Sequence, residues 1–212
     1  MMKLYNANFS PNALRVRAVA LELGIDLEII EVDIRGGDNR STEFLSMNPN
    51  AKVPVLVDGD FVVWESRAIN SYLASKKPER GLYPDDPKPR AIVDQWLYWQ
   101  TIHLGPAMQK LSFERFLKGK FGMGDPDQSV IDAELKNVDQ FLAVLDIGLA
   151  GKDWIAGNLS VADFALASTF MYRVPSDISL DDLPNVAAWI ERLEARASWK
   201  KAYAPVQALF GG

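Results

Sequence analysis

Apolar positions follow two different periods along the chain, short and strand-like in the first third and helical in the rest. Short alternating or continuous apolar runs predict strands at residues 3–5, 27–32, 54–57 and 61–64. Apolar residues at helical spacing predict helices over residues 11–23, 42–47 and 66–75. The predicted order is a βαβ unit, a short helix and a ββα unit.

Capping and turn residues support the predicted bounds of the helices and strands. Ser10-Pro11 is typical of a helix start, because serine caps free N–H groups and proline fits the first helical position. Gly24 is typical of a helix end. Asp58-Gly59 separates two apolar runs and predicts a tight β-hairpin.

Four prolines fall within residues 77–89, and they predict a linker. Beyond it the pattern is helical throughout. Helices are predicted over residues 88–120, 128–149, 160–173, 185–196 and 198–209. The chain therefore reads as a mixed α/β domain at 1–76, a linker at 77–89 and an all-α domain at 90–212.

Composition excludes several kinds of site. The chain has no cysteine, so it has no disulfide, thiolate metal site or cysteine nucleophile, and its only histidine is His103. We therefore predict no metal site. The formal charge is 23 − 28 = −5 with no basic run, which argues against nucleic acid as a partner. No apolar run reaches the roughly 20 residues of a membrane span, and the N-terminus lacks a secretory pattern. We expect a cytoplasmic protein without a membrane partner.

Two segments carry a family pattern. Residues 48–56, N-P-N-A-K-V-P-V-L, and residues 58–72, D-G-D-F-V-V-W-E-S-R-A-I-N-S-Y, lie in order in the first half. They resemble the N-P-x-G-x-V-P-x-L and D-x6-E-S-x-A-I-x-x-Y segments of the cytosolic glutathione transferases. Residues 160–163, S-V-A-D, are similar to that family's capping box. The resemblance covers nearly the whole chain and implies a thioredoxin-like N-terminal domain followed by an all-α domain.

The resemblance implies a glutathione site on the first domain. It places a cis bond before Pro54, so that the Val53 backbone pairs with the cysteinyl part of glutathione. It places Glu65 and Ser66 at the γ-glutamyl end, where a helix N-terminus and a serine hydroxyl suit a carboxylate. Without the family pattern, Pro54 would only start a strand, and Glu65 and Ser66 would only cap a helix.

Three further residues are candidates for the glycine carboxylate of glutathione. In phi-class members the segment that resembles residues 38–41 carries a histidine and a lysine; here Asn39 replaces the histidine and Arg40 retains the cation. Lys52, just before Val53, is a second candidate cation. Arg40 and Lys52 are equally compatible with solvated surface charges.

Ser10 is the candidate that acts on the thiol. The resemblance is to serine-type, phi-like members, in which this hydroxyl stabilises a glutathione thiolate. Ser10-Pro11-Asn12 also resembles the Thr-Pro-Asn of bacterial nu-type members, so Asn12 is a candidate to share or take over the role. Tyr5 is placed too early for a tyrosine-type site. A helix cap alone is the other interpretation of Ser10.

The family implies an enzyme, a glutathione transferase with a role in detoxification. It would conjugate the thiolate of glutathione to small hydrophobic electrophiles, with glutathione as co-substrate, no permanently bound cofactor and a homodimeric assembly. Alternatives are a glutathione-dependent peroxidase or disulfide reductase, an isomerase or dehalogenase on the same site, and a non-catalytic glutathione-binding protein. Candidates for the electrophile pocket are Phe9, His103, Met108, Leu111 and Phe116.

Overall fold

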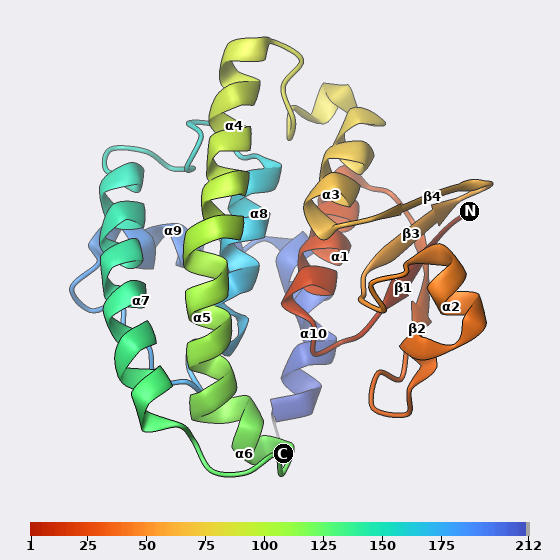
Figure 1. Ribbon diagram of the computed structural model, residues 1–212. Helices are drawn as coiled ribbons and strands as arrows, with labels where there is room; N and C mark the ends of the chain where they lie inside the picture. The colour runs from red at the N-terminus through yellow and green to blue at the C-terminus, as the bar shows by residue number, and fades with distance from the viewer. Residues whose placement is uncertain (211–212) are drawn as a thin grey trace. The chain divides into compact units, whose positions relative to one another are not determined.

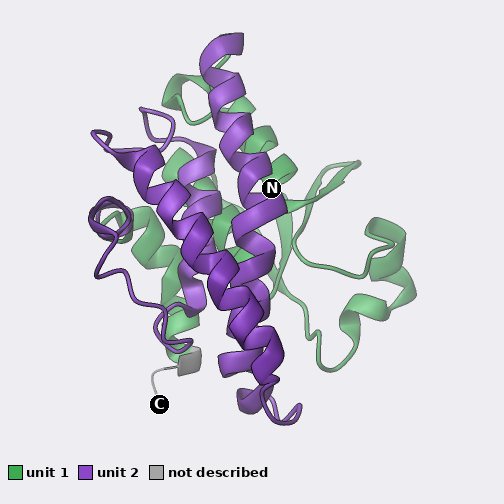
Figure 2. Ribbon diagram, turned by 60° about the vertical axis from the view of Figure 1, so that its left-hand side comes forward, with its two compact units in different colours: residues 1–85, 194–212 green, residues 86–193 purple. Residues whose placement is uncertain are grey.

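The computed structural model describes residues 1–210. The chain divides into two compact units, the first made of Met1–Asp85 and Glu194–Gly212 and the second of Asp86–Leu193 (Figure 2). The first unit thus includes the C-terminal helix as well as the N-terminal α/β segment. The domain bounds expected from sequence, 1–76, 77–89 and 90–212, stay a prediction, and residues 211–212 lie outside the described part of the chain.

A four-stranded mixed sheet forms the centre of the first unit. Its strands are β1 (Met2–Asn6), β2 (Leu27–Glu31), β3 (Val55–Asp58) and β4 (Phe61–Trp64), in the order β2-β1-β3-β4. β1 pairs with β2 in parallel, while β1–β3 and β3–β4 are antiparallel. All four strands were predicted from sequence to within one or two residues, and the thioredoxin-like architecture is confirmed.

Helices cover both faces of this sheet. The first unit contains α1 (Pro11–Leu23), η1 (Asp38–Arg40), α2 (Thr42–Met47), α3 (Ser66–Ser75), η2 (Pro78–Arg80) and α10 (Ala197–Phe210). α1 and α3 lie side by side on one face and α2 lies on the other, while α10 packs against α1 (Figure 1).

Strand alternation explains the two layers of core. Leu4 pairs with Leu56 across β1 and β3, and both side chains are fully buried toward α1 and α3. The neighbouring pair, Tyr5 and Val55, faces the opposite side and belongs with Phe44 of α2 to a second apolar cluster. This second cluster also includes Phe9, in the loop between β1 and α1, and Val53, in the loop before β3.

The predicted caps are confirmed. The Ser10 hydroxyl oxygen accepts the Ala13 N–H at 3.3 Å at the start of α1, and Gly24 ends the helix with φ 68°. Gly59, in the β3–β4 turn, has φ 65°, a conformation that glycine adopts without strain. These local signals hold the bounds of α1 and of the hairpin.

The second unit is helical. It contains α4 (Pro87–Trp99), η3 (Gln100–Leu104), α5 (Gly105–Ser112), η4 (Phe113–Leu117), α6 (Lys118–Lys120), α7 (Gln128–Leu149), α8 (Val161–Ala167), η5 (Ser168–Tyr172) and α9 (Pro184–Glu194). The predicted all-α segment is confirmed. The helix expected over 88–120 is continuous but carries two π-helical turns, and the one expected over 160–173 tightens into a 3-10 turn after Ala167.

The first π-turn has a local cause. Pro106 has no N–H to donate to the carbonyl four residues earlier. The helix instead widens, and the Gly105 N–H reaches back to the Gln100 carbonyl. A Cβ at Gly105 would lie 2.6 Å from that same carbonyl oxygen, so the turn depends on glycine here.

Two details of the helical segment differ from or extend the sequence prediction. α4 begins at Pro87, inside the expected linker, because Asp86 accepts the Lys88 N–H at 2.9 Å and proline costs nothing in a first turn. The predicted capping box is confirmed, with Ser160 and Asp163 bonding reciprocally at the start of α8. Within residues 1–210, no helix is both long and apolar enough to span a bilayer.

Candidate active site

Ser10 lies between β1 and α1, where the chain enters the helix. Its hydroxyl oxygen accepts a bond from Ala13, so the hydroxyl hydrogen remains available as a donor, and among residues 1–210 it has no acceptor. Asn12 is exposed in the first turn of the same helix. A helix N-terminus also presents unpaired N–H groups and a partial positive charge. The position suits an anionic sulfur.

Val53 presents an unpaired backbone edge. The Val53–Pro54 peptide bond is cis, as the family pattern predicts. Val53 lies two residues before β3 and outside its ladders, and neither its N–H nor its C=O bonds to another of the described residues. Its side chain is buried in the cluster around Phe44. The residue therefore offers one donor and one acceptor that an extended peptide can use.

Two asparagine side chains brace the loop before Val53. Asn39 donates to the Ala51 carbonyl at 2.7 Å, and Asn48 donates to the Lys52 carbonyl at 2.7 Å. Ala51 itself has φ 54°, unusual for a residue with a Cβ. Asn39 was expected to bind glutathione, yet its donor is used on the loop. The Asn39 Oδ1 is buried without a partner among the described residues.

Arg40 and Lys52 are both exposed, and neither forms an ion pair within residues 1–210. Their charges are thus available to an incoming carboxylate. Whether they hold the glycine end of glutathione stays a prediction.

Glu65 and Ser66 form the start of α3. Glu65 is exposed and adopts φ 70°, ψ 108°, a conformation that costs a non-glycine residue about 1–3 kcal/mol and that clusters at functional sites. Ser66 is the first helical residue and is buried. The first N–H groups of α3 follow this turn directly, and they have no partner within the helix.

Two arginines at this place were missed by the sequence analysis. Arg15 of α1 is buried and donates to the Ser66 hydroxyl at 3.4 Å. Burial, and then the charge of Arg67, hold the pKa of Arg15 well below its ordinary value, while Glu65 opposes them. Burial lowers the pKa of Arg67 to about 10, again against Glu65. The only sequence signal for them was their spacing: Arg15 lies five residues after Ser10, and Arg67 directly follows Ser66.

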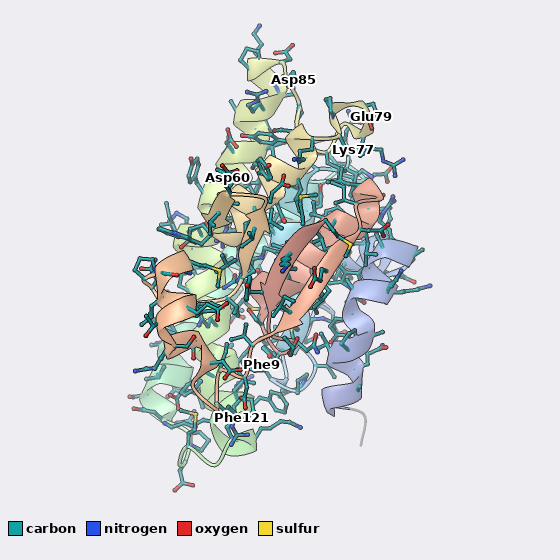
Figure 3. The ribbon with its side chains drawn as sticks, turned by 90° about the vertical axis from the view of Figure 1, so that its right-hand side faces the viewer. Phe9, Asp60, Lys77, Glu79, Asp85 and Phe121 are labelled. Carbon is teal, nitrogen blue, oxygen red and sulfur yellow. The ribbon has the colours of Figure 1, made fainter. Side chains whose placement is uncertain are left out.

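The candidate electrophile residues are divided between the units. Phe9 follows β1 in the first unit (Figure 3) and packs against the cluster around Val53. In the second unit, Met108 and Leu111 are buried, Phe116 contacts Tyr172, and His103 is exposed. His103 also lies beside two further aromatic rings, those of Trp99 and Phe141. A common pocket for these residues stays a prediction.

Comparisons with known proteins agree with this geometry. Residues 1–75 match the family model "Glutathione S-transferase, N-terminal domain", and residues 101–197 match "Glutathione S-transferase, C-terminal domain". Glutathione S-transferase 3 of Zea mays is 35% identical over 211 residues, covering 97% of this chain and 94% of its own. The chain belongs to the glutathione S-transferase family.

Relatives from two kingdoms support a glutathione transferase function. Glutathione S-transferase D7 of Drosophila melanogaster is 37% identical over 193 residues, 90% of this chain and 83% of its own. Among solved structures, glutathione S-transferase I bound with lactoylglutathione superposes with a TM-score of 0.88 at 33% identity, over 96% of this chain and 99% of that one. The maize enzyme in complex with an atrazine glutathione conjugate gives 0.88 at 32% identity, over 97% and 98%.

Proposed function

We propose that this glutathione S-transferase binds reduced glutathione along the free edge at Val53, ionises its thiol beside Ser10 and transfers the thiolate to small hydrophobic electrophiles. The observation that carries the proposal is the unpaired Val53 backbone next to a braced loop. An extended tripeptide that pairs there gains two backbone hydrogen bonds without the protein having to break any.

The carboxylates of glutathione would then reach complementary ends of the site. The γ-glutamyl carboxylate would meet the first N–H groups of α3, the Ser66 hydroxyl and the positive charge of Arg15 and Arg67. The glycine carboxylate would meet Arg40 and Lys52. Asn39 would act on this end through the Ala51 carbonyl that it holds.

Ser10 would supply the chemistry. A free thiol has a pKa near ~8.5, so little thiolate exists at neutral pH. A hydroxyl that donates to sulfur at a helix N-terminus favours the anion, and a lowering of about two pKa units corresponds to roughly 2.7 kcal/mol. The thiolate attacks the electrophilic carbon or the atom bearing the leaving group, and the sulfur–electrophile bond forms as the leaving group departs. Ser10 is not itself a nucleophile.

The experiment is a binding and turnover series on the purified protein. Calorimetric titration with reduced glutathione should give saturable heat, and Arg40→Ala and Lys52→Ala should each weaken binding several-fold. Lys88→Ala, which removes an exposed cation from the start of α4, is the charge-matched control and should not. Turnover of an aryl halide but not of an organic hydroperoxide supports conjugation. The reverse result favours the peroxidase alternative, and binding without either turnover favours the non-catalytic one.

We also propose that the protein is a homodimer. Tyr98 and Ile102 are 66% and 65% exposed on one stripe of α4 and η3, and the edge strand β4 exposes Phe61 and Trp64. Tyr98 and Ile102 are four residues apart and so adjoin on one helix face, and adjoining exposed apolar side chains, unlike single ones, are typical of surfaces that associate. In light scattering, Tyr98→Glu should shift the mass from twice the chain mass toward one chain. Val174→Glu, at another exposed apolar residue, should leave it dimeric.

A further inference from the structure

A buried polar chain runs beneath the loop that carries Ser10. Arg17 of α1 is buried, and its two terminal nitrogens divide between two partners. One donates to Asn6 Oδ1 at the end of β1, and the other donates to the Ala202 carbonyl of α10 at 3.1 Å. One guanidinium thus joins a strand to the last helix of the chain.

Asn6 connects Arg17 with the loop at residues 7–9. It is fully buried, and its Nδ2 donates to Glu31 Oε2 at 2.5 Å and to Asn8 Oδ1 at 3.1 Å. The other Glu31 oxygen accepts the Asn8 N–H at 2.8 Å. Asn8 is therefore held through both its backbone and its side chain. Ser10 follows two residues later, and its own N–H closes a turn onto the Ala7 carbonyl at 2.9 Å.

The burial of Arg17 is costly for a purely structural residue. A buried guanidinium loses hydration, and an apolar side chain of similar length would fill the space at lower cost. Burial lowers the pKa of Arg17 to about 10, with the charge of Glu31 opposing this change. Its Nε also lacks a partner among the described residues. What the charged network provides, and an apolar core would not, is a fixed orientation for the loop at residues 7–9.

We propose that Arg17, Asn6 and Glu31 are positioning residues for the reaction. Their hydrogen bonds fix the loop before Ser10 relative to β2 and α10. None of the three is placed to touch the sulfur; they act through Asn8 and the turn at Ala7. The catalytic consequence rests on the proposed function, because the Ser10 hydroxyl must point at the thiol. A misplacement of about 1 Å in such a group can cost up to 10²-fold in rate.

The test compares two arginines that each connect α1 with the segment that ends the chain. Arg17 connects to the loop through Asn6, whereas Arg196 bonds to Glu22 near the C-terminal end of α1. The variants are Arg17→Met, Arg17→Lys, and Arg196→Met as control. Amide hydrogen exchange at Asn8 and Ser10 reports on the loop without glutathione. Thiolate absorbance of bound glutathione against pH reports on the chemistry.

Arg17→Met should raise exchange at both amides at least tenfold and raise the bound thiol pKa by about one unit, with kcat falling more than KM rises. Arg17→Lys retains the positive charge but has one donor nitrogen in place of the two that bond Asn6 and Ala202, so it should lie between Arg17→Met and the native protein. Arg196→Met should lower the melting temperature without either change. The proposal is overturned if Arg17→Met leaves both readouts at native values, or if Arg196→Met changes them equally.

Glu31→Gln keeps the proposal testable should Arg17→Met fail to fold. Glu31 is exposed, so the substitution preserves shape and solvation while weakening the bonds to Asn6 and Asn8. Amide hydrogen exchange at Asn8 should rise several-fold. A native exchange rate in this variant would contradict the positioning role of Glu31. If native bound glutathione titrates like the free thiol, the proposed function fails, whereas the exchange measurements still decide the positioning role.

Discussion

Arg15, in the second turn of α1, donates a hydrogen bond to the Ser66 hydroxyl at the start of α3 across 3.4 Å. The contact links the starts of two neighbouring helices, one carrying the proposed thiol site and the other the proposed carboxylate site. β1 and β4 run in the same direction, so α1 and α3, which follow them, both start at the carboxyl end of these strands. A ligand that spans them would need a thiol and a carboxylate several bonds apart, as glutathione has.

Arg15→Met should weaken glutathione binding about tenfold. The substitution removes a charged donor that orients Ser66, and a hydrogen bond from a charged group contributes about 1.5 kcal/mol or more. Calorimetry measures the affinity. Arg115→Met is the matched control, since Arg115 is a hydrogen-bonded helix arginine too; it donates to the Ser176 and Asp177 carbonyls within the second unit. Equal loss of affinity in both variants would contradict the role of Arg15.

Ser66→Ala should raise KM for glutathione more than it lowers kcat. The hydroxyl would bind the γ-glutamyl carboxylate in the ground state and in the transition state alike, so its loss removes uniform binding. Steady-state kinetics with glutathione varied at saturating electrophile gives the two constants. A fall in kcat with KM unchanged would move Ser66 from binding to the chemical step.

Most helices and strands could be predicted from local sequence signals, and those features that could not be predicted have physical reasons. α1 and α7 were predicted with their observed bounds. Ser10 and Gly24 mark those of α1 in the sequence, and the helical spacing of apolar residues marks those of α7. The two π-turns in the helix after Asp86 were not predicted, and the first of them arises where Gly105 and Pro106 interrupt an otherwise helical pattern. The return of α10 to the first unit was also hidden, because a contact between Arg17 and Ala202 has no local sequence mark.

The candidate site shows the same division. Val53, Glu65 and Ser66 were predicted because a family pattern names them. Arg15 was missed because an arginine in an amphipathic helix ordinarily lies on the solvated face. Only the tertiary fold shows that this one is buried against Ser66.

Asp163→Ala should destabilise the protein by about 3 kcal/mol or more. The carboxylate accepts bonds from the Ile155 and Ser160 backbone, the Ser160 hydroxyl and the Trp189 indole at 2.9–3.0 Å, all in a buried setting. Each buried donor left unpaired costs about 1–3 kcal/mol. Urea unfolding measures the change. Asp153→Ala removes an exposed partner of Arg192 and should change stability by less than about 1 kcal/mol.

The Glu22–Arg196 pair should make stability depend on pH in the acid range. Burial raises the pKa of Glu22, but hydrogen bonds from Arg196 and Ser198 and the charges of Arg196 and Arg80 outweigh it, so the pKa lies below its ordinary value of 4.5. A lowered folded-state pKa contributes stability that is complete above the unfolded value and is lost as pH falls through the folded one.

The native protein should therefore exceed Glu22→Gln in stability at pH 7, and the difference should shrink as pH falls below about 4. Urea unfolding of both proteins at pH 7, 4 and 3 tests this. Asp153→Asn, at an exposed and weakly paired carboxylate, is the control and should show little pH-dependent difference. If the stability difference between the native protein and Glu22→Gln stays constant or grows toward pH 3, the lowered pKa of Glu22 is contradicted.

The most direct measurement of the central claim is the ultraviolet thiolate absorbance of bound glutathione, titrated against pH in the native protein and in Ser10→Ala. Asp86→Ala, which removes a helix cap remote from Ser10 in the sequence, controls for capping. The account predicts a thiol pKa well below ~8.5 in the native protein and in Asp86→Ala, and a rise of about one to two units in Ser10→Ala with affinity within a few-fold. An identical titration curve in Ser10→Ala would contradict it and assign the thiolate to Asn12 instead.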